Sequence, residues 1–231
     1  MDSLRRHKYA ILLTTLVGVA LIESFSHRLV LGPVLSDVLI STTLLLVFLI
    51  VFERWVDRLV AVIAVGTAVA IYWVRYVLPD SAELPLRLIY HSATLLLVGF
   101  AVIVTLRNIF EHRVARIDDV LGTVCGYLLA AAAWANLFLL IEIFFPGSFS
   151  VGPGFSARLD TWNGRIALLN YVSLGSLTSV GSGEVVAVRP PATMLTTLEA
   201  MFGQFYIAVV VAQLVGARIS HGLQRNGSPR D

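Results

Sequence analysis

The sequence is poor in charge and has a single cysteine. Only 14% of its 231 residues are charged and 57% are apolar, whereas about a quarter of the residues in a soluble domain carry charge. Cys125 lies inside an apolar run, which excludes a disulfide framework and a paired-cysteine metal site. The formal net charge of +2 is too small to indicate a nucleic-acid partner.

Motifs for enzymatic chemistry are missing as well. The sequence has no Gly-rich phosphate-binding loop, no His-Glu-x-x-His pair and no nucleophile beside a plausible base. These absences predict that the protein is not an enzyme and has no cofactor. The 11 residues after Ser220 are too few for a ligand-sensing domain, so we expect no soluble partner.

Long apolar runs take the place of charge. A transmembrane helix needs about 20 mostly apolar residues, and five runs of roughly that length fit, with a shorter one before them. The predicted spans are 9–26, 30–52, 58–78, 86–109, 119–145 and 192–217. A basic segment precedes the first span, as in a signal peptide, but the poor cleavage site at residues 21–24 favours an uncleaved helix. The sequence therefore predicts an all-α integral membrane protein with six transmembrane helices in a lipid bilayer.

Basic residues in the short connections predict the orientation of these spans, because cytoplasmic loops carry an excess of Lys and Arg. With the N-terminus in the cytoplasm, 11 of the 17 Lys and Arg residues lie on the cytoplasmic side. We therefore expect a multi-pass protein of the cell inner (plasma) membrane with both termini in the cytoplasm. The fourth span has arginines only near its ends, Arg87 and Arg107, and lacks the arginine ladder of a voltage sensor.

A shorter segment lies between the fifth and sixth spans. The 14 residues from Gly164 to Leu177 would form a helix of about 21 Å, which is too short to cross a bilayer. This length predicts a re-entrant helix that enters the membrane and returns on the same side. An irregular return is tolerated where it lines a water-filled cavity, and the partially negative C-terminal end of the helix favours a cation there.

The residues after this short helix form the most specific motif. They read Thr178-Ser179-Val180-Gly181-Ser182-Gly183-Glu184. This segment resembles the selectivity filter of the potassium channels, whose pattern is Thr-Val-Gly-Tyr-Gly-Asp. Residues 198–208 and 214–216 look like the inner helix of the small bacterial potassium-channel-like family, a two-helix pore-loop family, and the fifth span fits its outer helix. The first four spans would be additions to that family.

The resemblance implies a division of the chain and an assembly. It predicts a four-helix N-terminal region (1–110), a cytoplasmic linker (111–118), a pore module with outer helix, pore helix, filter and inner helix (119–220) and a short cytoplasmic tail (221–231). One chain supplies one filter strand, so the resemblance implies a homotetramer around a central axis. The implied function is a tetrameric potassium-type channel that conducts monovalent cations.

In such a filter, rings of backbone carbonyls replace the water shell of the ion. The resemblance implies K⁺ or Na⁺ bound by the carbonyls of Ser179, Val180, Gly181 and Ser182. Carbonyls that all face one axis require backbone conformations that alternate between positive and negative φ. Gly181 and Gly183 can adopt positive φ at little cost. The Ser179 hydroxyl would be the innermost ligand, and Glu184 would form a ring of carboxylates at the outer mouth.

Ser182 departs from the family pattern, because potassium channels have Tyr or Phe at this position. That ring packs on the pore helix and braces the filter, which a serine cannot do. The pore helix also has Tyr171 alone in place of the family's aromatic pair. We therefore predict a weakly selective filter that passes sodium at a substantial fraction of its potassium conductance.

Two carboxylates and two glycines in the spans are further candidates, because ionisable residues inside a membrane indicate function. Glu142 and Glu199 could each hydrogen-bond the back of the pore helix and brace the filter with Tyr171. For Glu142, a position at the membrane interface fits equally well. Gly203 and Gly216 in the last span fit both a gating hinge and close helix packing.

One function of a different class also fits these features. The chain could be a non-conducting, channel-like subunit that interacts with other membrane proteins. A potassium gradient across liposomes distinguishes the two functions, because only a channel dissipates it.

Overall fold

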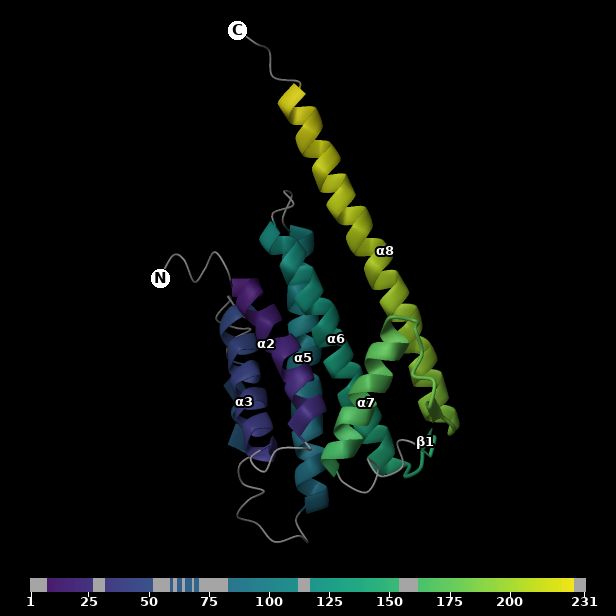
Figure 1. Cartoon of the computed structure of the whole chain (residues 1–231). Helices are drawn as coiled ribbons and strands as arrows, with labels where there is room; N and C mark the ends of the chain where they lie inside the picture. The colour runs from purple at the N-terminus through teal and green to yellow at the C-terminus, as the bar shows by residue number, and fades with distance from the viewer. Residues whose placement is uncertain are drawn as a thin grey trace.

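In the computed structural model, the chain is mostly helical. The structure describes residues 8–26, 32–51, 59, 62–63, 65–67, 69–70, 83–111, 117–153 and 162–226. Its elements are α2 (Lys8–Ser26), α3 (Gly32–Val51), α5 (Glu83–Glu111), α6 (Ile117–Phe144), β1 (Phe149–Val151), α7 (Trp162–Leu177), β2 (Val185–Ala187) and α8 (Pro190–Asn226). Helices α2, α3, α5 and α6 stand side by side, and α8 extends well beyond them toward the C-terminus (Figure 1).

Three described helices are long and apolar enough to cross a membrane. Their candidate spans are Leu84–Arg107 in α5, Val120–Phe144 in α6 and Pro190–Gln213 in α8. The apolar stretches of α2 and α3 are shorter, Tyr9–Leu21 and Ile40–Val51, and the predicted span 58–78 lies largely outside the described residues. By length and composition these helices indicate a membrane protein, whereas the count of six spans stays a prediction.

Two buried clusters of apolar side chains meet on α6. The first joins α2, α3, α5 and α6 and includes Leu12, Val47, Leu97 and Leu129. The second joins α6, α7, the two strands and the start of α8 and includes Phe138, Phe149, Leu168 and Val185. Because α6 contributes to both clusters, the N-terminal helices pack directly on the outer helix of the predicted pore module. The predicted linker 111–118 lies mostly outside the described residues.

The two short strands connect the end of α6 to the start of α8. They pair in antiparallel fashion, with Phe149 opposite Ala187. The amide of Val188 also donates to the carbonyl of Ser148 at 2.9 Å. This pairing closes the segment that contains α7 into a loop between two candidate spans (Figure 1).

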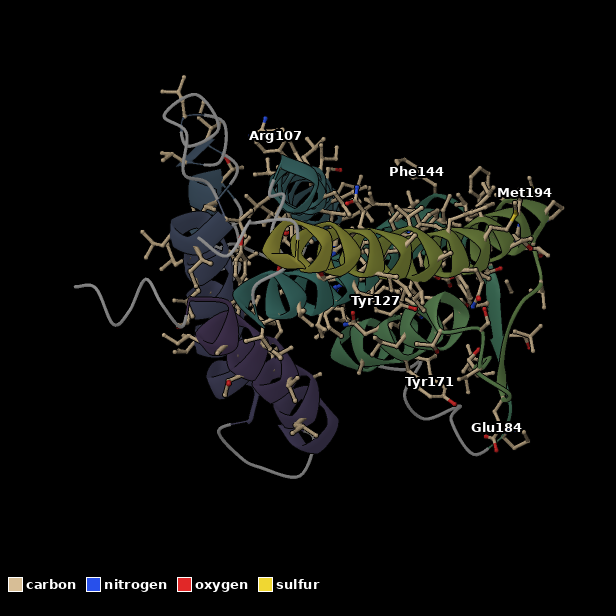
Figure 2. The ribbon with its side chains drawn as sticks, turned by 90° about the horizontal axis from the view of Figure 1, so that it is seen from above. Arg107, Tyr127, Phe144, Tyr171, Glu184 and Met194 are labelled. Carbon is tan, nitrogen blue, oxygen red and sulfur yellow. The ribbon has the colours of Figure 1, made fainter. Side chains whose placement is uncertain are left out.

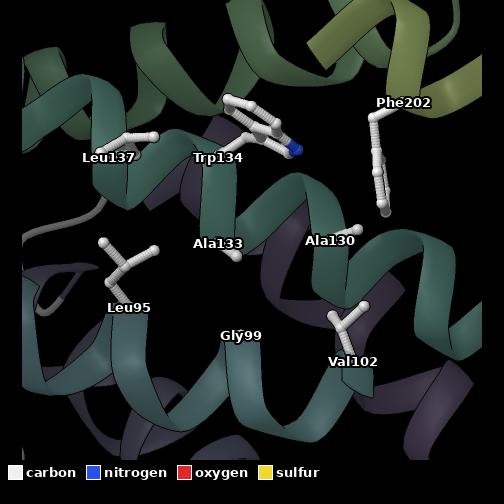
Figure 3. Close-up of a pocket in the computed structure, with 8 residues that line it drawn as sticks. All are labelled: Leu95, Gly99, Val102, Ala130, Ala133, Trp134, Leu137 and Phe202. Carbon is white, nitrogen blue, oxygen red and sulfur yellow. The ribbon is translucent and has the colours of Figure 1, made fainter. Parts of the chain in front are cut away.

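Aromatic side chains attach α8 to α6. The hydroxyl of Tyr206 donates to the carbonyl of Thr123 at 2.8 Å. One turn earlier, the ring centroid of Phe202 lies 6.4 Å from that of Trp134. These two rings border an apolar pocket of ≈160 Å³ between α5 and α6 (Figure 3). The helix continues through residues 221–226, which the sequence analysis assigned to the tail, and ends where Asn226-Gly227 precedes Pro229, a typical stop signal.

Candidate functional site

Helix α7 and the segment after it form the candidate site. The helix has 16 residues, fewer than the about 20 that a span needs. It packs against α6 and α8. After Leu177 the chain reverses and runs back along α8 toward β2 (Figure 1). We call residues 178–184 the return segment.

The sign of the backbone φ angle alternates along part of the return segment. The φ angle is +58° at Ser179, +82° at Gly181 and +57° at Gly183, whereas Val180 and Ser182 between them do not have positive φ. The positive φ that was predicted for the two glycines is therefore present. Ser179 was not expected to adopt it, because an L-residue in this region is strained by roughly 1–2 kcal/mol.

Hydrogen bonds hold Ser179 in this conformation. Its amide donates to the carbonyl of Ser176 at 2.9 Å. The side chain of Gln204 on α8 donates from Nε2 to the Ser179 hydroxyl oxygen, also at 2.9 Å. Gln204 was not singled out from the sequence, since a glutamine in an apolar helix shows no partner by itself. Its polarity in that helix is the signal that could have identified it.

The return segment is braced on α7 by a direct backbone contact. The amide of Gly181 donates to the carbonyl of Gly175 at 3.0 Å. A Cβ atom at Gly175 would lie 3.0 Å from the carbonyl oxygen of Gly181 and 3.1 Å from its carbonyl carbon. Any larger residue at this position would therefore crowd the two backbones. Sequence analysis missed this role, although a glycine in the last turn of a helix often marks a close backbone approach.

Ser182 is buried, with 9% of its surface exposed. Its hydroxyl donates to the carbonyl of Val185 at 2.6 Å and so fixes the return segment to the start of β2. Tyr171, the predicted aromatic brace, is 46% exposed and lies on the side of α7 that faces away from α8 (Figure 2). The Gly175 contact and the Ser182 hydrogen bond are thus the described contacts that tie the return segment to α7 and to β2.

Glu199 lies at a contact of three helices. Its side chain is 0% exposed, and the Ser173 hydroxyl oxygen on α7 lies 2.5 Å from its Oε1. The same hydroxyl oxygen lies 2.7 Å from the carbonyl oxygen of Ala131 on α6. The contact that the sequence analysis anticipated between Glu199 and the short helix is thus present. We call Ala131, Ser173 and Glu199 the three-helix node.

Glu142 hydrogen-bonds the turn after α6 and not the short helix that the sequence analysis had anticipated for it. Its Oε1 accepts a hydrogen bond from the amide of Gly147 and its Oε2 accepts one from the amide of Ser148, each at 2.9 Å. Both amides belong to the turn after α6, where Gly147 has a φ of +76°. The carboxylate therefore caps this turn and does not brace the back of α7. The hypothesis of a direct bond from Glu142 to the short helix is corrected accordingly.

Gly203 lets α8 approach the C-terminal end of α7. A Cβ atom at Gly203 would collide with the carbonyl oxygen of Leu177, which also accepts a hydrogen bond from the Tyr127 hydroxyl at 2.8 Å. Of the two roles left open for Gly203, the structure shows close packing. At Gly216, by contrast, a Cβ atom would have no neighbour within 4 Å among the described residues.

Much of the site is exposed in a single chain. Val180 is 82% exposed, and Thr178, Ser179, Gly181, Gly183 and Glu184 are also exposed. The share of the apolar window that is buried is 22% in the candidate span of α8, compared with 44% in that of α5 and 50% in that of α6. The exposed large apolar side chains of helix α8 are Met194, Leu198, Met201, Phe205, Ile207, Val209, Val211 and Val215. The described residues of one chain therefore leave much of the return segment and of α8 uncovered.

In the part of the chain that the structure describes, no group of three or more His, Cys, Asp or Glu side chains could hold a metal ion. The return segment instead offers backbone carbonyls and the hydroxyls of Thr178 and Ser179. Rings of carbonyls are the ligands that replace the water shell of K⁺ in selective pores. Chemically, the segment therefore suits a dehydrated monovalent cation.

No protein-family model, no curated protein and no solved structure matches this chain. The resemblance to the potassium-channel-like family remains a prediction that depends on the motif at 178–184. The proposed function therefore depends on the geometry of α7, the return segment and α8.

Proposed function

We propose that this chain is the pore-forming subunit of a tetrameric potassium-type cation channel. The observation that carries the proposal is the alternation of positive φ at Ser179, Gly181 and Gly183. A backbone that alternates in this way could direct successive carbonyls toward one side of the strand, and four such strands around an axis would form rings of oxygens. The carbonyls of residues 179–182 would bind K⁺ or Na⁺ in place of water.

The surrounding elements support a cation at this place. The C-terminal end of α7, at Leu177, immediately precedes the return segment, and a helix C-terminus carries a partial negative charge. At the other end of the segment, Glu184 is exposed. Four carboxylates at that end would raise the local concentration of cations.

A homotetramer is the assembly that the proposal requires, because one chain supplies one strand. The exposed Val180 and the exposed apolar face of α8 are the surfaces that the neighbouring subunits would cover. We expect native mass spectrometry of the detergent-solubilised protein, and chemical crosslinking in liposomes, to show four copies. A protein that remains monomeric or dimeric while it conducts would contradict this assembly.

Conduction is tested with purified protein in liposomes that hold a potassium gradient. We expect the protein to dissipate the gradient, whereas protein-free liposomes retain it. A folded tetramer that leaves the gradient intact would rule out the channel and favour the non-conducting, channel-like subunit.

The selectivity of the pore between sodium and potassium is a separate prediction, and it depends on Ser182. The hydroxyl bond to Val185 is the local brace at the position where the family has an aromatic ring. A neutral hydrogen bond contributes about 0.5–1.5 kcal/mol, less than the burial of a large aromatic side chain. We therefore expect bi-ionic reversal potentials to show substantial sodium permeation.

Ser182→Ala removes this hydroxyl, and we expect it to increase the sodium-to-potassium permeability ratio. Ser150→Ala, which changes an exposed serine on β1, is the matched control. A wild-type pore with strong potassium selectivity that Ser182→Ala leaves unmoved would show that carbonyl number and field strength, and not this brace, set the preference.

A further inference from the structure

The three-helix node sets how α7 and α8 pack just before the return segment. Ser173 and Leu177 are four residues apart on one face of α7, and Glu199 and Gly203 are four residues apart on one face of α8. Ser173 contacts Glu199, and Leu177 contacts Gly203. A change at the node therefore acts on the helix end from which the return segment starts.

The number of donor protons limits the hydrogen bonds at the three-helix node. The Ser173 hydroxyl oxygen lies within hydrogen-bond distance of both the Ala131 carbonyl oxygen and Glu199 Oε1. A hydroxyl has one proton to donate, and a carbonyl oxygen can only accept. If Ser173 donates to Ala131, the second short contact needs a proton from Glu199. Each of the two contacts has a proton of its own only when Glu199 is a carboxylic acid.

The surroundings of Glu199 provide no compensation for a negative charge. Among the described residues, its Oε2 is buried without a hydrogen-bond partner. The ionisable side chain that faces it from α6 is that of Tyr127, and α7 contributes the neutral Ser173. In this described environment, no basic side chain acts on Glu199. A buried charge without a partner is strongly unfavourable, so such groups become neutral.

We propose that Glu199 is a proton-binding site that regulates the pore. The neutral carboxyl donates its proton to the Ser173 hydroxyl and holds α7 against α8. When the carboxyl O–H bond breaks and the proton passes to bulk water, Ser173 has two acceptors and one proton. One of its two short oxygen–oxygen contacts becomes repulsive, and the end of α7 moves away from α8. The regulation depends on the proposed channel function, whereas the protonated state does not.

Potassium flux in liposomes at a series of pH values tests the regulation. We expect wild-type flux to fall several-fold as the pH rises from neutral to alkaline. Glu199→Gln has an amide that donates to Ser173 and does not titrate, so its flux should lose the pH dependence. Glu142→Gln, which changes a carboxylate that caps a turn, is the matched control and should keep it. A Glu199→Gln protein with the wild-type pH dependence would overturn the regulatory role.

Infrared spectroscopy of the same liposomes tests the proton without any need for conduction. The carbonyl-stretch band of a protonated carboxylic acid should be present in wild type and in Glu142→Gln at neutral pH, should be missing in Glu199→Gln, and should disappear as the pH rises. Absence of this band in wild type would overturn the assignment. If none of the proteins conducts, the regulatory role falls together with the channel function. The band still decides whether Glu199 binds a proton.

Discussion

Gly203→Ala is expected to separate α8 from the end of α7 and to destabilise the protein strongly. The new methyl group would collide with the carbonyl oxygen of Leu177. This oxygen cannot move away easily, because the Tyr127 hydroxyl holds it by a hydrogen bond of 2.8 Å. Overpacking of this kind costs about 1–3 kcal/mol per chain. The gain in helix propensity from glycine to alanine, about 0.5–1 kcal/mol, is smaller.

The thermal stability of the detergent-solubilised protein measures this effect, with Gly216→Ala as the matched control on the same helix. Among the described residues, a Cβ atom at Gly216 meets nothing within 4 Å, so this change should leave the stability unchanged or raise it slightly. We also expect Gly203→Ala to reduce the fraction of tetramer. Equal stability of the two variants would show that the contact between Gly203 and Leu177 does not hold the helices together.

Gly181→Ala is expected to reduce potassium flux by more than tenfold while the chain still folds. At Gly181 a Cβ atom would meet no described neighbour within 4 Å, but the φ angle there is +82°. The penalty is therefore conformational, roughly 1–2 kcal/mol per chain. Relief of this strain would turn the carbonyl away and break the hydrogen bond to Gly175. In a tetramer the penalty applies four times, and each 1.4 kcal/mol is a factor of about ten, so flux should fall by more than tenfold.

The control for this variant is Gly99→Ala, which adds the same methyl group to α5 at a position with open space and no positive φ. Its flux should equal that of wild type. A Gly181→Ala channel that conducts normally would contradict the proposed filter. Ion conduction would then not depend on the positive φ at residue 181. Native mass spectrometry of both variants separates a loss of conduction from a loss of assembly.

Local features of the sequence predicted part of the site. The length of the apolar segment predicted a short helix, and the structure contains α7 at Trp162–Leu177. The resemblance to a filter implied a backbone of alternating φ, in which Gly181 and Gly183 can adopt positive φ, and both have it. These features depend on hydropathy and on the conformational freedom of single residues, which sequence neighbours determine. The same local information could not identify Ser179 as a third residue with positive φ, because its hydrogen-bond partner Gln204 lies 25 residues away.

The sequence by itself determined that this is a membrane protein with long apolar helices and with a short helix followed by a glycine-containing return. Only the tertiary structure decided which buried carboxylate reaches the short helix. Glu199 bonds to Ser173 across 26 residues, whereas Glu142 turns to amides five and six residues away. It also decided that a Cβ atom would be crowded at Gly175 and would collide at Gly203, whereas at Gly216 it would meet no described neighbour. These differences depend on the rotation and register of packed helices, and the hydropathy of a span constrains neither.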